Sequence, residues 1–197
     1  MKAFALVAVS CAGLALSAGA TDLVPHYIST TADGVVVRRP YFADGKKKFG
    51  VKIDSETKLT AFEGGALFRF DKFPEATMRL RLSPISTPGP FGPETLEHYQ
   101  QVAQSLLPAG AEEIALLESA LNPLPINGWQ SYRVTFSYRA ATEPRRQSVI
   151  FLNLKPSEQI LVQTDSAERS FNEVSARAFD IVRRWHEIVP EDEQPYN

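Results

Sequence analysis

The chain has 197 residues, of which 44% are hydrophobic and 22% are charged, and its formal net charge is -2. This balance is typical of a globular domain with enough apolar residues for a sizeable core, and it excludes a disordered or fibrous protein. The net charge is too small, and the basic residues are too scattered, to indicate a nucleic-acid partner. We therefore expect one folded domain that binds no nucleic acid.

The first twenty residues have the pattern of a signal peptide. Lys2 precedes an apolar run from Ala3 to Leu16, and Ala18-Gly19-Ala20 places small residues where signal peptidase reads them. The run is shorter than the roughly 20 apolar residues that span a bilayer, and no later segment has that character. We expect cleavage after Ala20 and a periplasmic or secreted protein without a transmembrane segment.

Cys11 is the only cysteine and lies inside this apolar run. Cleavage after Ala20 leaves a mature chain that forms no disulfide and has no thiolate chemistry. The alternative is lipid attachment to Cys11, as in bacterial lipoproteins. That alternative lacks the usual leucine three positions earlier, where Ala8 stands, and it leaves a very short apolar run.

The mature chain is predicted to contain one domain with short flanking segments. Residues 21–34 are polar and show no period, so we expect an N-terminal arm. A single α+β domain is expected over residues 35–189, and residues 190–197 form an acidic tail.

The first half of this domain has the pattern of short strands joined by tight turns. Asp-Gly pairs precede β-rich runs near Val35–Arg38 and Lys48–Ile53. Gly64-Gly65 can supply the positive φ angles of a hairpin between strands at Lys58–Glu63 and Ala66–Phe70.

The stretch ATMRLRLS, residues 76–83, alternates without a break. Met78, Leu80 and Leu82 share one face of the predicted strand, and Arg79 and Arg81 share the other. We expect the first face to be buried in the core.

Two helices are predicted from apolar residues spaced three and four apart. The Pro- and Gly-rich loop Ser83–Pro93 leads into a helix from Pro93 to Leu107, with Pro93 at its first position. Ser170 and Glu173 suggest a capping box for the second helix, whose apolar stripe extends to Ile188. The two apolar stripes are Leu96, Tyr99, Ala103 and Leu106, and Phe171, Val174, Ala178, Ile181, Trp185 and Ile188.

Four further strands are predicted in the second half. EEIALLESAL is ambiguous between helix and strand, and we favour a strand because little room remains before Asn122-Pro123. The run from Ser131 to Tyr138 alternates with period two, and SVIFLNL is apolar on both sides, which is typical of a central strand. QILVQT completes the set.

No motif in the sequence predicts catalysis, a metal or a cofactor. Ser131 follows Gly128-Trp129-Gln130 at the start of a strand, and Tyr132 stands where a nucleophile elbow needs its second glycine. We interpret Ser131 as a polar side chain on the less buried face. The histidines, His26, His98 and His186, lack zinc spacing, and neither a calcium loop nor a phosphate-binding glycine motif occurs.

The second half resembles the PsbP-like fold, which an extrinsic photosystem II subunit shares with exported bacterial proteins. The resemblance lies in NGWQSYRVTFSY, the hydrophobic strand SVIFLNL, the strand QILVQT, and TDSAERSFNE leading into the last helix. It implies an antiparallel β-sheet with helices on both faces, an α/β/α sandwich, and a non-enzymatic binding or assembly role. No metal or photosystem residue is carried over, and the poor lipid-attachment pattern departs from the many relatives that are lipoproteins.

Two functions remain open on this reading. The first is an exported, non-catalytic domain that binds a protein partner or an envelope component. The second is a hydrolase of an envelope polymer that uses carboxylates such as Glu63 or Glu97. A carboxyl with a raised pKa inside a concave pocket is the feature that favours the second.

Four arginines are candidate ligand-binding residues. Arg79 and Arg81 alternate with the apolar residues of one strand, Arg69 with Phe68 and Phe70, and Arg133 with Tyr132 and Val134. If the three strands lie close together, the guanidinium groups form a basic patch for carboxylate or phosphate groups of an anionic envelope component or acidic partner. The alternative is a solvated face whose arginines pair with nearby carboxylates.

Overall fold

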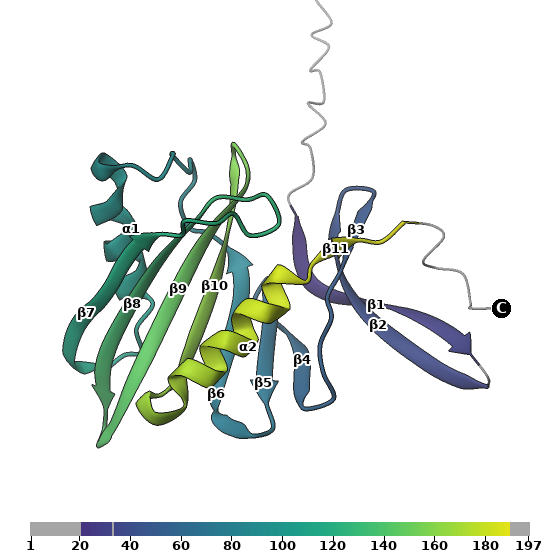
Figure 1. Ribbon diagram of the computed structural model, residues 1–197, viewed down its shortest axis with the longest axis horizontal. Coiled ribbons are helices and arrows are strands. Elements are labelled where there is room, and N and C mark those ends of the chain that lie inside the picture. The colour runs from purple at the N-terminus through teal and green to yellow at the C-terminus, as the bar shows by residue number, and fades with distance from the viewer. Residues whose placement is uncertain (1–20, 33, 190–197) are drawn as a thin grey trace, which may run out of the picture.

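The computed structural model describes residues 21–32 and 34–189, which form two antiparallel sheets and two α-helices (Figure 1). The predicted signal peptide and the acidic tail lie outside the described residues. The strands are β1 (Asp22–Ala32), β2 (Val35–Asp44), β3 (Lys47–Gly50), β4 (Thr57–Phe62), β5 (Gly65–Phe70), β6 (Phe73–Leu82), β7 (Glu112–Leu121), β8 (Ser131–Ala140), β9 (Glu143–Lys155), β10 (Glu158–Ala167) and β11 (His186–Glu187). The helices are α1 (Pro93–Ser105) and α2 (Phe171–Arg183), with a 3-10 turn at Glu168–Ser170.

The large sheet has seven strands in the order β4-β5-β6-β10-β9-β8-β7, and α1 and α2 pack on opposite faces of it (Figure 1). We call these the α1 face and the α2 face. Side chains along β10 alternate between them: Ile160 and Val162 belong to the cluster under α2, while Leu161 packs in the cluster under α1. The central strands are therefore apolar on both sides, as SVIFLNL in β9 predicted.

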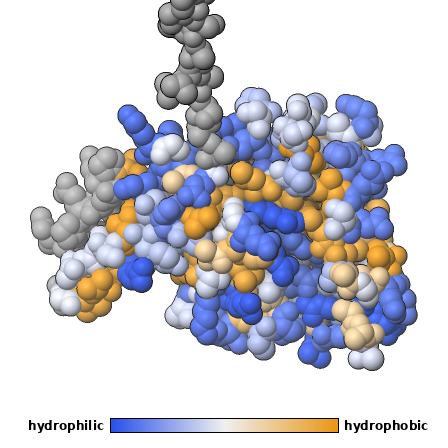
Figure 2. Space-filling model, turned by 180° about the vertical axis from the view of Figure 1, so that it is seen from behind, coloured by the Kyte–Doolittle hydropathy of each residue, from blue (hydrophilic) through white to orange (hydrophobic). Residues whose placement is uncertain are grey.

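The small sheet has the order β1-β2-β3-β11, and its β1–β2 hairpin projects from the body of the molecule as an arm (Figure 1). At its base the small sheet shares the α2-face core, because Leu23 and Phe42 are buried in the same cluster as Trp185. Its far end carries exposed valines, seen as apolar surface at the left of Figure 2. The arm therefore has little packing around its tip.

Several sequence predictions need correction here. Residues 22–32, expected as part of an aperiodic arm, form strand β1, because β2 supplies backbone hydrogen-bond partners to a segment with no apolar period of its own. Helix α2 ends at Arg183, and the chain beyond Trp185 pairs with β3 instead. Leu82 is 36% exposed, because it stands at the end of β6.

The capping box predicted for α2 does not form. Ser170 Oγ donates to Glu75 Oε1 at 3.0 Å and to the Ala167 carbonyl at 3.1 Å, and it makes no cap hydrogen bond to the helix. The hydroxyl ties the start of α2 to β6 instead.

The predicted class, α+β with an antiparallel sheet, is confirmed, and so is the strand over EEIALLESAL. Each helix covers only part of its face, with α1 lying over β8 and α2 over β10, β6 and β9. None of the helices in the described ranges has the length and apolar character needed to cross a membrane.

Candidate functional site

A pocket of about 460 Å³ lies on the α1 face, beside the C-terminal end of α1. Helix α1 ends at Ser105 and the chain turns away at Pro108, which leaves this part of the sheet without a helix above it. We call it the α1-face pocket. Its lining residues come from β6, β8, β9, β10 and the end of α1: Glu75, Thr77, Arg79, Leu106, Pro108, Tyr138, Ala140, Glu143, Arg145, Gln147, Gln163 and Asp165.

Two buried glutamines fix the end of α1 to the sheet at the edge of the pocket. Gln147 Nε2 donates to the Ala103 carbonyl at 3.1 Å, and Gln163 Nε2 donates to the Leu106 carbonyl at 3.1 Å. These carbonyls belong to the last turn of the helix, where the regular donors four residues on are missing, and the Ala103 carbonyl otherwise accepts the Leu106 N–H at 3.3 Å. Gln163 Nε2 also donates to Gln147 Oε1 at 2.8 Å, so the pocket edge is held by a continuous amide network.

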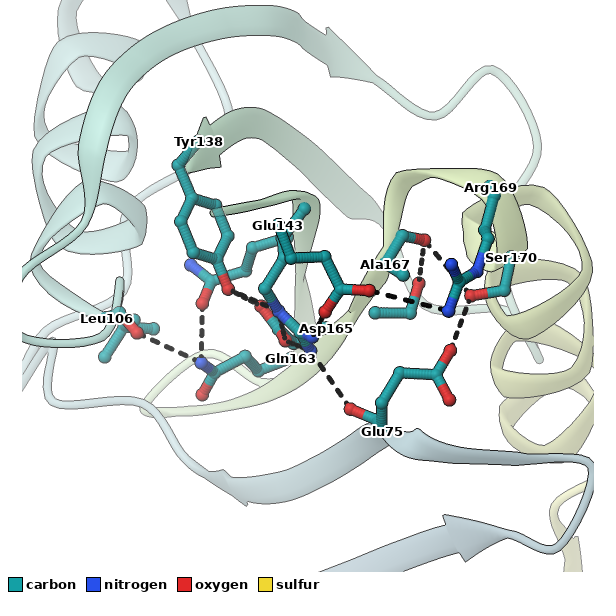
Figure 3. A network of polar contacts seen from close by, with 12 residues as sticks. Glu75, Leu106, Tyr138, Glu143, Gln163, Asp165, Ala167, Arg169 and Ser170 are labelled. Carbon is teal, nitrogen blue, oxygen red and sulfur yellow. Dashed lines mark hydrogen bonds and ion pairs between the residues drawn. The ribbon is translucent and has the colours of Figure 1, made fainter. Parts of the chain in front are cut away.

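An ion pair forms one wall of the pocket (Figure 3). Arg145 donates to Asp165 through both Nε, at 3.1 Å, and a terminal nitrogen, and the Tyr138 hydroxyl donates to the other oxygen of Asp165. The side chains of Arg145 and Asp165 are each only 13% exposed. Both bonds from Arg145 end on one oxygen of Asp165, and a mostly desolvated pair with two charge-assisted hydrogen bonds holds its members in one geometry.

This wall continues toward α2. Arg145 also donates to the Glu75 backbone carbonyl at 3.0 Å, and its other terminal nitrogen lies 3.3 Å from Glu143 Oε2. Arg169 lies 3.5 Å from the second oxygen of Glu143 (Figure 3). The carboxylates on this side of the pocket therefore already have cationic or hydroxyl partners.

The pKa shifts of Tyr138 and Arg145 agree with a fixed ion-paired structure of this wall. Burial raises the pKa of Tyr138 above its ordinary value, and the hydrogen bond and charge of Asp165 raise it further. Burial opposes the charge of Arg145, but the hydrogen bond and charge of Asp165 outweigh it and raise the pKa of Arg145 above its ordinary value. Tyr138 stays neutral and Arg145 stays charged at neutral pH, so neither exchanges a proton there.

The raised pKa of Tyr138 predicts a loss of stability in alkali. Below pH about 10 the tyrosine is protonated in both states; above it the unfolded chain releases the proton while the folded chain retains it, so the free energy of unfolding falls as pH rises. In Tyr138→Phe this loss should be absent, and the stability advantage of the parent over the variant should shrink between pH 9 and 11, a window of about one unit on each side of the reference pKa. Urea unfolding across that range measures the difference, and a constant difference contradicts it.

The opposite wall of the pocket carries Arg79, which shares its face of the sheet with two further arginines that do not line the pocket. Arg79 lines the pocket, Arg81 follows two residues later on the same face of β6, and Arg69 stands on the neighbouring strand opposite Thr77. None of the three forms an ion pair or hydrogen bond with a carboxylate of residues 21–32 or 34–189. We call Arg69, Arg79 and Arg81 the arginine face.

Within the described ranges, the environment of these arginines offers them no direct carboxylate partner. The Arg79 guanidinium lies 5.5 Å from the centroid of the Phe62 ring, and the Nε of Arg81 is buried without a hydrogen-bond partner. Burial lowers the pKa of Arg81, the charge of Arg79 lowers it further, and Glu63 raises it in part. A group that accepts hydrogen bonds and carries negative charge is what this wall lacks.

The structure brings together three of the four predicted arginines and separates the fourth. In the register of the sheet, Arg133 stands beside Ile150 of β9, Ile150 beside Val162 of β10, and Val162 beside Leu80 of β6. Leu80 is buried under α2, so Arg133 also lies on the α2 face. There it forms an ion pair with Glu118 at 2.6 Å. The expectation of one patch containing all four is therefore wrong for Arg133.

Three other candidate residues lie away from the pocket. Ser131 lies on the α2 face and is fully buried, because both faces of β8 are covered near its start. The predicted position on a less buried face is therefore wrong. Glu63 is exposed in the β4–β5 turn, and Glu97 is exposed on α1, where it accepts a hydrogen bond from Gln101 at 3.3 Å. The two carboxylates named for hydrolysis do not meet in the α1-face pocket.

Sequence reasoning missed the ion-paired wall. The scattered basic residues gave no reason to single out Arg145, and the predicted strand QILVQT ends at Thr164, one residue before Asp165. A signal was present in the polar residues Gln147, Gln163 and Asp165, which border otherwise apolar strands. Buried polar side chains at such positions need partners, and they find them at the end of α1 and in each other.

Comparisons with known proteins reveal similarity in structure only. No family model matches the chain, and no curated protein matches it in sequence. LpqN of Mycobacterium tuberculosis, described as involved in cell envelope biogenesis, matches 83% of this chain and 92% of its own at 13% identity, with a TM-score of 0.50.

Two further solved structures are similar. PA94 of Pseudomonas aeruginosa, a protein of unknown function, matches 84% of this chain and 97% of its own at 10% identity, with a TM-score of 0.45. The cyanobacterial PsbP of Synechocystis matches 91% and 98% at 12% identity, with a TM-score of 0.42. At these identities the likeness concerns the fold alone. A PsbP, the family whose fold the sequence resembles, is thus among the structures to which this chain is similar.

Proposed function

We propose that this chain is an exported, non-catalytic binding protein whose arginine face holds an anionic group of an envelope component or an acidic partner. The observation that carries the proposal is that Arg69, Arg79 and Arg81 share one face of β5 and β6 without an ion-pair partner among the described residues, with Arg79 lining a pocket of about 460 Å³. Carboxylate or phosphate oxygens match the fork of a guanidinium group and accept two hydrogen bonds from it.

Electrostatics favours an anion at this place. Arg79 and Arg81 repel each other across one face of the strand, and the surrounding burial weakens the screening by water. An anion between them relieves that repulsion and accepts hydrogen bonds from the terminal nitrogens of the two guanidinium groups. Arg145 does not compete for it, because Asp165 and Glu143 already occupy its donors.

Export and an envelope location are supported by the amino-terminal pattern, in which Lys2, an apolar run and Ala18-Gly19-Ala20 follow each other. The role given for LpqN, in cell envelope biogenesis, is of the same kind. A non-catalytic role is supported by the α1-face pocket itself. Its ionisable wall is engaged in fixed pairs, and a neutral Tyr138 and a charged Arg145 offer no proton transfer near neutral pH.

Replacing both strand arginines should abolish most anion binding. The variant Arg79→Ala/Arg81→Ala is expected to lose at least about tenfold in affinity for pyrophosphate and for citrate, because a hydrogen bond to a charged group contributes about 1.5–3 kcal/mol. The parent should bind both probes more weakly at high salt, and the variant should lose that salt dependence. Isothermal titration calorimetry at low and at physiological salt measures both effects.

Arg133→Ala is the matched control, since it removes a strand arginine that is ion-paired on the opposite face. It should bind both probes as the parent does. Equal losses of affinity in the control and in the double variant would show that the effect comes from the change in net charge alone. A parent that binds neither probe would contradict the proposed function.

A further inference from the structure

A second concave site lies between the β1–β2 arm and the strands at its base. Its volume is about 600 Å³, within the range of about 300–1,000 Å³ that is typical of small-molecule sites. The apolar part of its lining comes from four segments of the chain: Ile28, Val37, Val51, Ile53 and Ile188. We call it the hairpin groove, and it shares no lining residue with the α1-face pocket.

Cations lie along the same groove. Arg38, Arg39 and Lys52 line it, and none of them forms an ion pair with a carboxylate in the part of the chain that the structure describes. The Arg38 guanidinium lies over the Tyr27 ring, 4.6 Å from its centroid. All three are exposed, so their charged ends reach the solvent beside an apolar wall.

The apolar wall extends along the arm. Val37 is 39% exposed, and Val35, two residues earlier on the same face of β2, is 62% exposed. Figure 2 shows the apolar surface at the far end of the arm. A two-stranded ribbon gains little stability by exposing valines to water, so this surface is suited to contact with something apolar.

Neither a purely ionic nor a purely apolar ligand fits both parts of the groove. A small inorganic anion meets the cations but leaves the valine and isoleucine side chains in water, while a neutral hydrocarbon leaves the cations unpaired. We infer that the hairpin groove binds a single-chain amphiphile with an anionic head: the acyl chain lies on the apolar wall, and a carboxylate or phosphate meets Arg39 and Lys52. This site does not depend on the arginine face.

Titration of the full chain with monomeric sodium dodecanoate, followed by calorimetry, tests the inference. We expect saturable binding with one ligand per chain, about tenfold tighter for dodecanoate than for decanoate, since each buried methylene contributes to the affinity. Dodecyltrimethylammonium, which has a cationic head, should bind at least about tenfold more weakly than dodecanoate.

Variants on the two halves of the groove separate head from chain. Arg39→Ala/Lys52→Ala should lower the affinity for dodecanoate at least about tenfold, and Val37→Ser should reduce the gain from decanoate to dodecanoate. These side chains are exposed, so the variants should fold. Arg79→Ala/Arg81→Ala should bind dodecanoate as the parent does, whatever its effect on pyrophosphate, which keeps this test apart from that of the arginine face.

Three results would overturn the inference. The first is an affinity that depends neither on chain length nor on Arg39 and Lys52. The second is binding to vesicles of anionic phospholipid but not to monomeric dodecanoate, which makes a bilayer the occupant. The third concerns residues 190–197, which begin near Ile188 and carry Glu191, Asp192 and Glu193. If Glu191→Gln/Asp192→Asn/Glu193→Gln binds dodecanoate and the parent does not, the acidic tail occupies the groove.

Discussion

Replacing Trp185 with alanine is expected to lower the free energy of unfolding by about 3–5 kcal/mol. Trp185 is 8% exposed and stands where α2, the small sheet and the loop before β8 meet. Its ring lies 5.2 Å from that of Phe42 and 6.2 Å from that of Trp129, measured between centroids. Truncation therefore opens a cavity that no single element can close by moving. Urea unfolding followed by circular dichroism gives the change.

Trp185→Phe is the control for this substitution. The indole nitrogen has no hydrogen-bond partner, so phenylalanine loses packing volume but no hydrogen bond, and the variant should retain most of the stability. Equal unfolding midpoints for Trp185→Ala and the parent would show that the base of the small sheet contributes nothing to the core.

The second large effect is expected at the ion-paired wall. Asp165→Ala should cost about 3 kcal/mol, because it removes the carboxylate that accepts two hydrogen bonds from the mostly buried Arg145 and leaves only the longer carboxylate contact with Glu143 at 3.3 Å. The Tyr138 hydroxyl loses its acceptor in the same step. Most of this cost should disappear when the charge of Arg145 is removed as well, in Arg145→Met/Asp165→Leu, since a well-packed apolar pair can replace a buried ion pair.

Glu118→Ala provides the comparison, because Glu118 forms an ion pair with Arg133 while both side chains are more than a third exposed. Its cost should stay below about 1 kcal/mol. Chemical denaturation of the four proteins measures these differences. If Asp165→Ala and Glu118→Ala had the same small effect, the wall would not be a rigid support for the pocket.

Much of the sheet was predictable from the sequence because the physical signal is local. Alternation over residues 131–138 and 76–82, and the Gly64-Gly65 turn, depend on neighbours within one strand or hairpin. The two helices were predictable from their apolar spacing. Strand β1 was not, because it is held mainly by backbone pairing with β2 and by a few contacts at its base such as that of Leu23, which leave no period in the side chains.

The sequence predicted on which side of its own strand each arginine lies, but not which face of the whole sheet that side belongs to. Alternation places Arg79 opposite Met78 and Leu80, and Arg133 opposite Tyr132 and Val134, but it does not say which face each apolar set covers. In a sheet covered on both sides, the two sets differ: Met78 and Leu80 pack under α2, while Tyr132 and Val134 pack under α1. The arginines that alternate with these two sets therefore lie on opposite faces of the sheet, Arg79 on the α1 face and Arg133 on the α2 face.

The partners of the arginines were not predictable for a related reason. Glu118 on β7 pairs with Arg133 on the adjacent strand β8, and Asp165 on β10 pairs with Arg145 on the adjacent strand β9. Both ion pairs therefore depend on the register between two strands. No carboxylate of the described residues pairs with Arg79 or Arg81 at their position in the sheet. That difference identifies the arginine face, and it needs the structure.

The most direct test of the account is a nuclear magnetic resonance titration of the arginine side chains with pyrophosphate. The account predicts saturable shifts of the Nε–H resonances of Arg79 and Arg81, because neither guanidinium group has a carboxylate partner among the described residues. The resonances of Arg133 and Arg145, which are already ion-paired, should stay in place. Shifts spread evenly over all arginines, or confined to Arg38 and Arg39, would contradict an anion site on the α1 face.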